Sequence, residues 1–374
     1  MNFELSEEQA MLREASRDLL ADRASIDAVR AALDGDQDVD PGLWELAAQL
    51  GWPGLTLPSE YGGIEQGLTE LVLVAEELGR ALARGPFGPT AIVGRALVTD
   101  SSPTLRNEIL PALASGAAWA TWAFAEPQAP WALDGIRTGV TANGDEFVLH
   151  GVKTAVQDAD GARWLLVTAQ HNGTAESYLI DRDAAGVTLR RQRTIDLTRA
   201  FYEVELDGVR VPAHRRLEAG ADRIQRLLDY ASIARCADAV GVMQRMVELT
   251  VEHANSRVQF DRPIGSFQAV KHSCADMAMI VHGARAATYS AAMAVDAGAG
   301  DAARAACVAA AYTAAGAGEV AARALQTHGG IGFTWEHDLH LYLRRAEADA
   351  VLYGDPALHR DRLCTLLRQP AVTH

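Results

Sequence analysis

Residues 257–277, RVQFDRPIGSFQAVKHSCADM, hold a dense set of groups suited to an anionic, planar ligand. Arg257 offers a rigid fork of N–H donors that fits a phosphate, and Gln268 supplies both a donor and an acceptor. Phe260 lies between them, and a proline and a glycine place the segment at a turn between two helices. Composition alone leaves two interpretations open: a site for a phosphate-bearing ligand, or an ordinary helix–turn–helix corner with surface ion pairs.

A second segment, QTHGGIGF at residues 326–333, adds groups of the same kind. Gln326 is another amide, and Gly329 and Gly330 carry no side chain, so a ligand can come close to the backbone there. The nearby histidines lack the spacing to a carboxylate that a helical metal site needs. No metal site is therefore predicted.

Length and charge limit the class of protein. A chain of 374 residues predicts two or three domains, and 49% hydrophobic with 22% charged residues is ordinary for a globular protein. The formal charge of −15 argues against nucleic-acid binding, which needs a basic face. A phosphorylated small ligand is still compatible, because a few local arginines suffice to bind it.

The chain shows no sign of a membrane or secretory protein. It has no run of roughly 18 uninterrupted apolar residues, which a bilayer span needs. The N-terminus is acidic and amphipathic, unlike a secretory signal. The four cysteines are far apart in the sequence, which indicates reduced core residues in a cytosolic protein. We therefore predict a cytoplasmic location.

Three regions of different pattern must position these groups. Residues 1–118 read as helical, with a helix start at Ser6. Residues 119–218 hold short β-branched runs separated by Asn-Gly and Asp-Gly pairs, which predicts an antiparallel β domain in the form of a β-barrel. Residues 219–374 predict a four-helix bundle. Its helices are expected at 222–256, 266–297, 301–328 and 337–368. The fold class is α+β.

This order of regions, together with the motifs, resembles the acyl-CoA dehydrogenase family, in particular its actinobacterial type. The segments at 257–277 and 326–333 are similar to two signatures of that family. AEP at 125–127, GVK at 151–153 and LDGVRVP at 206–212 stand where its β-domain landmarks are expected. The resemblance covers essentially the whole chain and implies an FAD-dependent α,β-desaturation of an acyl-CoA thioester in a tetrameric enzyme.

The resemblance also implies roles for individual residues. In the family, one subunit holds the adenine and pyrophosphate end of the FAD that belongs to its neighbour. The matching positions in this sequence are Arg257, Phe260, Gln268, Gln326, Gly329 and Gly330.

The part of the family pattern that contacts the flavin ring is altered in this chain. The family usually reads Thr-Glu-Pro-Gly-x-Gly-Ser-Asp, whereas this chain has Ala125 at the Thr position and the bulky Trp131 at the Ser position. The family's Trp and Thr beside the flavin are matched by Ala155 and Gln157. Four changes in one site indicate altered or absent flavin binding by the chain's own β domain.

The catalytic base is the sharpest departure. The reaction needs a carboxylate to take the α-proton while the β-hydrogen leaves as hydride to the flavin. The usual glutamate position is occupied by Tyr353, and the alternative position on the first bundle helix by Ala231. Asp238 and Asp355 are the candidates for a relocated base. Asp238 alternatively forms an ion pair with the nearby Arg235.

Two further charged groups are interpreted as structural. Asp196 and Arg199 are expected to form a salt bridge within the β domain. Arg344 and Arg345 are expected at a helix end or an interface, with a coenzyme A phosphate contact as the alternative.

Three functional hypotheses follow. In the first, the chain is one subunit of a heterotetrameric acyl-CoA dehydrogenase whose partner supplies the flavin pocket and the glutamate. In the second, it is a homotetrameric enzyme with a relocated base. In the third, it is a non-catalytic acyl-CoA-binding or assembly partner. The family implies an electron-transferring flavoprotein as the electron acceptor. Fatty, branched, aromatic and steroid side-chain thioesters are all compatible with the sequence.

Overall fold

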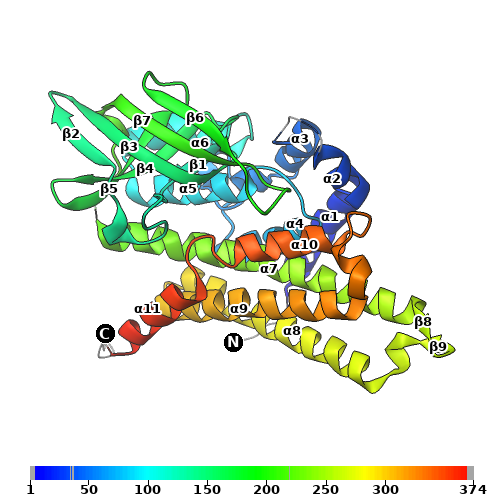
Figure 1. Cartoon of the computed structure of the whole chain (residues 1–374). Coiled ribbons are helices and arrows are strands. Elements are labelled where there is room, and N and C mark those ends of the chain that lie inside the picture. The colour runs from blue at the N-terminus through cyan, green and yellow to red at the C-terminus, as the bar shows by residue number, and fades with distance from the viewer. Residues whose placement is uncertain (1–4, 34, 36–37, 219, 369–374) are drawn as a thin grey trace.

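The computed structural model describes residues 5–33, 35, 38–218 and 220–368, and the predicted domain limits at 1, 219 and 374 lie outside them. N-terminal helices, a central sheet and C-terminal helices follow one another along the chain (Figure 1). The predicted α+β class with this order of elements is confirmed. The long helix α7 (Ala221–Ser256) runs beneath both the sheet and the N-terminal helices.

Six α-helices form the described N-terminal part. They are α1 (Glu7–Arg23), α2 (Ile26–Leu33), α3 (Pro41–Gln49), α4 (Leu68–Arg80), α5 (Phe87–Asp100) and α6 (Pro103–Ala114), with short 3₁₀ turns at Trp52–Gly54 and Ser59–Tyr61. Helix α1 begins where predicted, because Ser6 and Gln9 form a reciprocal capping box. Helix α4 is buried along most of its length, which places it in the core rather than on the surface.

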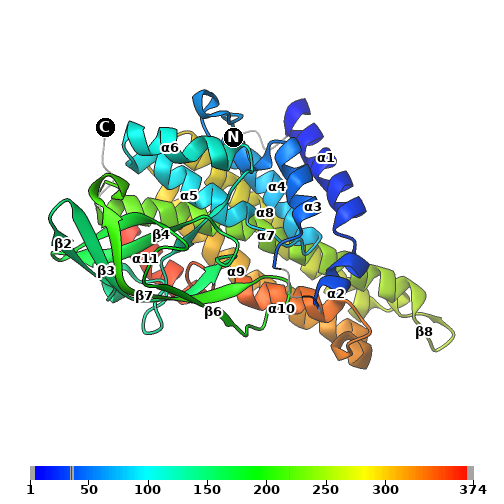
Figure 2. The same ribbon diagram turned by 90° about the horizontal axis from the view of Figure 1, so that it is seen from above.

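The central strands form one seven-stranded sheet in the order β1-β4-β2-β3-β7-β6, with β5 beside β4. The strands are β1 (Ala120–Ala123), β2 (Gly139–Asn143), β3 (Glu146–Gln157), β4 (Trp164–His171), β5 (Thr174–Asp181), β6 (Val187–Gln192) and β7 (Phe201–Pro212). Figure 2 shows the sheet toward one end of α7 and helices α1–α3 toward the other.

Two details of the predicted β domain are wrong. The sheet is mixed rather than antiparallel, because β1 pairs with β4 in parallel. The predicted turn at Asp207-Gly208 is not a hairpin. It lies inside β7, where the register against β3 shifts and Gly208 has a φ of 69°. The hairpin turns at Asn143-Gly144 and Asn172-Gly173 are confirmed, since β2 pairs with β3 and β4 with β5 across them.

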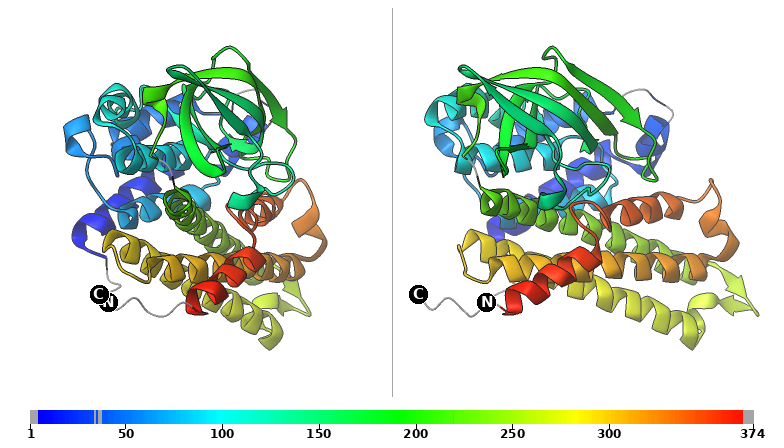
Figure 3. Two further views of the ribbon diagram at one scale, coloured as in Figure 1. Left: turned by 90° about the vertical axis from the view of Figure 1, so that its left-hand side faces the viewer. Right: turned by 60° about the vertical axis from the view of Figure 1, so that its left-hand side comes forward.

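The C-terminal part contains α7, α8 (Gln268–Asp296), α9 (Ala302–His328), α10 (Leu339–Asp349) and α11 (Pro356–Arg368). The predicted fourth helix, 337–368, is therefore two helices. Tyr353 and Gly354 between them have φ values of 61° and 115°, which a right-handed helix cannot contain. Pro356 then starts α11, where its missing N–H costs no helical hydrogen bond. Figure 3 shows α11 crossing the other helices at an angle.

One described helical segment, Ala302–Phe333, is apolar and long enough by composition to cross a membrane. Within the fold it is a core helix. More than half of its apolar window, 56%, is buried, and α9 packs against α7, α8 and α11. The prediction of core cysteines holds for Cys236 and Cys307, which are buried, but is wrong for the exposed Cys364.

Helices α4 and α7 cross in direct backbone contact at two glycines. A Cβ on Gly241 would lie 1.8 Å from the carbonyl oxygen of Glu76, and one on Gly79 would lie 2.0 Å from that of Asp238. Any larger residue must therefore push the two helices apart. This crossing fixes the depth at which the middle of α7 sits below the sheet.

We expect Gly241→Ala to lower the free energy of unfolding by about 1–3 kcal/mol, because the added methyl group overpacks the crossing. Denaturant unfolding followed by circular dichroism measures the change. Gly318→Ala is the matched control, since Gly318 lies in α9 with no heavy atom within 4 Å of the added Cβ. The control should gain up to about 1 kcal/mol from helix propensity. A neutral Gly241→Ala variant would contradict the packing argument.

Candidate functional site

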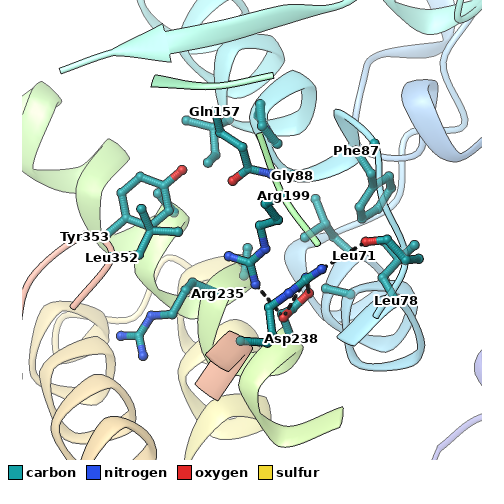
Figure 4. Close-up of a pocket in the computed structure, with 18 residues that line it drawn as sticks. Leu71, Leu78, Phe87, Gly88, Gln157, Arg199, Arg235, Asp238, Leu352 and Tyr353 are labelled. Carbon is teal, nitrogen blue, oxygen red and sulfur yellow. Dashed lines mark hydrogen bonds and ion pairs between the residues drawn. The ribbon is translucent and has the colours of Figure 1, made fainter. Parts of the chain in front are cut away.

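A cavity of about 70 Å³ lies where α4, α5 and α7 meet the sheet and the segment between α10 and α11 (Figure 4). Its wall from α4 and α5 is apolar and includes Leu71, Leu78 and Phe87. The opposite wall is polar. It includes Gln157, Arg199, Arg235, Asp238, Arg345 and Tyr353.

Asp238 lies on this wall and is held by two arginines. Its carboxylate oxygens lie 2.7 Å from Nη2 of Arg199 and 3.2 Å from Nη1 of Arg345. Burial opposes ionisation of Asp238, but the two guanidinium groups outweigh it and lower the pKa of Asp238 below its ordinary value. The predicted pairing with Arg235 is therefore wrong, and Asp238 is a weaker base than a free carboxylate.

The same arginines join two further carboxylates into one buried network. Arg199 Nη2 lies 2.6 Å from Asp349, and Arg345 Nε lies 3.0 Å from Asp196. The predicted Asp196–Arg199 bridge is present but long, at 3.6 Å. Arg345 was expected at a helix end or an interface, and this is wrong, because its side chain is only 1% exposed. In the sequence, only the i, i+4 spacing of Arg345 and Asp349 on one helix could have indicated that Arg345 lies beside acidic groups.

The other three base positions place no carboxylate on the wall of this cavity among the described residues. Tyr353 is half-buried, and burial raises the pKa of its hydroxyl above the ordinary value, so it stays protonated at neutral pH. Its ring packs 5.0 Å from that of Trp131. Asp355 is exposed and caps α11, since its Oδ1 accepts the N–H of Leu358 at 2.8 Å. Ala231 lines the cavity and is fully buried.

The AEP and GVK landmarks meet in a buried ion pair. Lys153 Nζ lies 2.7 Å from Glu126 Oε1 and also donates to the carbonyl oxygen of Phe124. Glu126 accepts the backbone N–H groups of Arg137 and Thr138. Burial lowers the pKa of Lys153 to about 8. Because the polar groups of Lys153 and Glu126 have these partners, the pair connects β3 to the segment after β1.

A second pocket, of about 600 Å³, opens between the sheet and the α10–α11 segment. Its wall is chiefly apolar and includes Trp131, Ala155 and Leu352. Of its polar side chains, Thr194 donates to the backbone of Asp196, and Asp355 caps α11 through one carboxylate oxygen. The backbone N–H of Ala155 donates to Gln192.

The six residues matched to the two signatures are all exposed and lie at or next to the C-terminal ends of α7 and α9 and the start of α8. His253, on the last turn of α7, stacks on His328, on the last turn of α9, with ring centroids 4.5 Å apart. This contact joins the end that carries Arg257 to the end that carries Gln326 and Gly329. Within residues 5–33, 35, 38–218 and 220–368, the Arg257 guanidinium has no hydrogen-bond or ion-pair partner.

Large apolar side chains are exposed at the same end of the bundle. Phe260 is 85% exposed, and Phe333 is 70% exposed. Val258, Ile331 and Trp335 are also exposed there. Apolar groups gathered in this way indicate a surface that contacts another molecule.

Comparison with known proteins decides the family. Residues 6–117 match the model of the acyl-CoA dehydrogenase N-terminal domain, and residues 218–365 match that of the C-terminal domain. The chain is 34% identical to the acyl-CoA dehydrogenase IpdE2 of Mycolicibacterium smegmatis over 364 residues, which covers 96% of this chain and 98% of that protein. The chain belongs to the acyl-CoA dehydrogenase family.

Solved structures of acyl-CoA dehydrogenases agree with this assignment. The ChsE4-ChsE5 complex from Mycobacterium tuberculosis is 28% identical with a TM-score of 0.92, covering 99% of this chain and 100% of that one. A variant of the steroid ACAD Tcur3481-Tcur3483 is 30% identical with a TM-score of 0.89, covering 96% and 98%. The chain thus belongs to a family of FAD-dependent oxidoreductases that act on the CH–CH group of acyl-CoA substrates.

The two halves of an acyl-CoA dehydrogenase FAD site fit this chain differently. At the bundle end, the exposed Arg257 guanidinium has no partner among the described residues, and a Cβ on Gly329 or Gly330 would meet open space, so these groups fit a pyrophosphate. In the pocket beside Trp131, the wall is chiefly apolar, and Thr194 and one oxygen of Asp355 are already engaged. These residues do not fit the polar edge of a flavin ring.

Proposed function

We propose that the chain is one subunit of a heterotetrameric acyl-CoA dehydrogenase and that it completes the FAD site of a partner subunit. Arg257, Phe260, Gln268, Gln326, Gly329 and Gly330 would hold the adenine and pyrophosphate end of the partner's FAD. The partner would supply the flavin pocket and the catalytic glutamate. FAD, when bound, accepts the hydride that leaves the acyl chain.

The contrast between the two ends of the molecule carries this proposal. At the bundle end, the Arg257 guanidinium, which has no partner in the described part of the chain, and the exposed Phe260 are available to contact a second molecule. Among the described residues that line the cavity, the one carboxylate, Asp238, is held by Arg199 and Arg345. The chain would keep the residues that hold the partner's FAD, but it lacks a free base in its own cavity. This combination fits a subunit that completes the active site of a partner.

The homotetramer with a relocated base is the second candidate, and the geometry argues against it. Asp238 would have to leave two buried guanidinium partners in order to take a proton from a substrate, which costs several kcal/mol. Asp355 would have to give up the cap of α11. Neither carboxylate is free to approach the cavity as a strong base.

The substrate and the cell compartment are also proposals. The similarity to a steroid ACAD favours a steroid-derived acyl-CoA among the acyl groups that the sequence left open. An electron-transferring flavoprotein would reoxidise the FAD, and the enzyme would work in the cytoplasm. A complex that oxidises fatty acyl-CoA but leaves steroid side-chain thioesters unchanged would overturn the substrate assignment.

Absorption spectroscopy of the purified protein tests the subunit hypothesis. We expect the chain alone to be colourless, and the chain co-purified with a family member that has an intact Thr-Glu-Pro motif and glutamate to show a flavin band bleached by acyl-CoA. The family member purified alone is the control, and it should hold less FAD than the complex. A full flavin band and bleaching in this chain alone would establish the homotetramer instead.

A further inference from the structure

The buried network around the cavity contains more acids than bases. Asp196, Asp238 and Asp349 face Arg199 and Arg345. The side chains of Asp196 and Asp349 are 0% exposed, that of Arg345 is 1%, that of Arg199 is 6% and that of Asp238 is 17%. Within this directly paired set, three carboxylates and two guanidinium groups, all ionised, would leave one excess negative charge. Two further guanidinium groups lie close by. Arg235 on α7 lines the same cavity and donates to Ser232, and Arg84 lies near Asp38 and Asp158.

A buried charge without a counter-ion costs several kcal/mol, whereas a carboxylate can avoid that cost by taking up a proton. We infer that this network is a buried proton site, in which the carboxyl group of Asp349 holds one proton and keeps the network neutral. This site joins three parts of the fold: the β6–β7 connection through Arg199, α7 through Asp238, and α10 through Arg345.

Asp349 is the least stabilised of the three carboxylates. Asp196 also accepts the N–H and the hydroxyl of Thr198, at 2.8 and 2.7 Å. Asp238 has two arginine partners. Asp349 has Arg199 on Oδ1, and its Oδ2 has no hydrogen-bond partner among the described residues. Burial and the neighbouring Asp238 raise the pKa of Asp349 to about 8.

Other titratable groups packed against the site do not replace this proton. Cys236 on α7 and Tyr353 beyond α10 are both neutral at pH 7, because burial raises the pKa of each. Asp158, directly after β3, is buried near Arg199 and Arg345 and accepts a hydrogen bond from Gln157, and burial raises its pKa to about 7. It therefore titrates in a similar range and must be distinguished by its own variant.

The proton makes the contact between the β6–β7 connection, α7 and α10 sensitive to pH. The pKa of Asp349 is raised in the folded chain and ordinary in the unfolded chain, so this group favours folding fully below about pH 4. That contribution is lost progressively up to about pH 8. Above this range the network carries a net charge, and the hold of the β6–β7 connection on α10 weakens. The wall formed by Leu352 and Tyr353 follows directly after α10.

The test is the number of protons released on unfolding, measured by calorimetry in buffers of different ionisation enthalpy. At about pH 6, the wild-type chain should release about one proton more than Asp349→Asn. Asp276→Asn is the matched control, because Asp276 pairs with Arg323 on the surface at 2.9 Å. It should release the same number as the wild type. Equal release by the wild type and Asp349→Asn would overturn the proposal.

Infrared spectroscopy of folded protein provides a readout that does not depend on the folding of Asp349→Asn. In an Asp158→Asn background, the carbonyl band of a protonated carboxylic acid should be present at about pH 6 and lost above about pH 8. Absence of this band at about pH 6 would show that the network holds no proton. This result is independent of whether the chain has a partner subunit.

Discussion

Replacing Arg257 by methionine is expected to weaken FAD binding by the two-subunit complex by about 10- to 100-fold. A charge-assisted hydrogen bond to a phosphate contributes about 1.5–3 kcal/mol, and about 1.4 kcal/mol corresponds to a factor of ten. Because the guanidinium has no other partner in the described part of the chain, its loss should leave the fold unchanged. Titration of the FAD-depleted complex with FAD, followed by flavin fluorescence, measures the affinity.

Arg262→Met is the matched control for this prediction. Arg262 lies in the β8–β9 hairpin (Val258–Gln259 and Arg262–Pro263), which directly follows Arg257, and its variant loses the same charge, but its guanidinium stacks on the Phe267 ring at 4.1 Å. It should change the FAD affinity much less than Arg257→Met. Equal weakening by both variants would indicate a general charge effect. An unchanged affinity in Arg257→Met would remove Arg257 from the proposed site.

Replacing Arg345 by methionine is expected to lower the free energy of unfolding by about 3–5 kcal/mol at neutral pH. The change leaves Asp196 and Asp238 without one of their partners in the interior. It also removes the hydrogen bonds that Arg345 donates to Thr198 and to the carbonyl oxygen of Ala83, which lies between α4 and α5. Denaturant unfolding monitored by circular dichroism gives the difference.

Arg344→Met separates this effect from the loss of any arginine on α10. Arg344 is the preceding residue, is only half-buried and makes one long contact of 3.4 Å to the carbonyl oxygen of Ile195. Its variant should change the stability by less than about 1 kcal/mol. If the two variants lose similar stability, the network does not have the energetic role assigned to it.

The sequence correctly indicated those features that depend on residues close together in the chain. The capping box at Ser6 and the Asn-Gly turns of the β2–β3 and β4–β5 hairpins involve neighbours a few positions apart. The order of helices, sheet and helices followed from regional changes in pattern. The two signatures led to the family, which the comparisons confirm.

The local pattern failed where a distant pairing or a special backbone conformation took precedence. A helical pattern over 337–368 gave no sign that Tyr353 and Gly354 adopt positive φ values, which end α10 early. The Asp-Gly pair at 207–208 is typical of a hairpin turn, but β7 continues through it and pairs with β3 on both sides, with a register shift at this point. Both outcomes depend on what packs against the segment.

By itself, the sequence determined the family, the element order and the identity of the groups at the bundle end. Only the tertiary structure decided which charges face one another. Asp238 has Arg235 three residues away on its own helix, yet its partners are Arg199 from the β6–β7 connection and Arg345 from α10. A charged group buried away from water is paired with an opposite charge that the fold places next to it. That choice depends on how sheet and helices pack, which no pattern along the chain records.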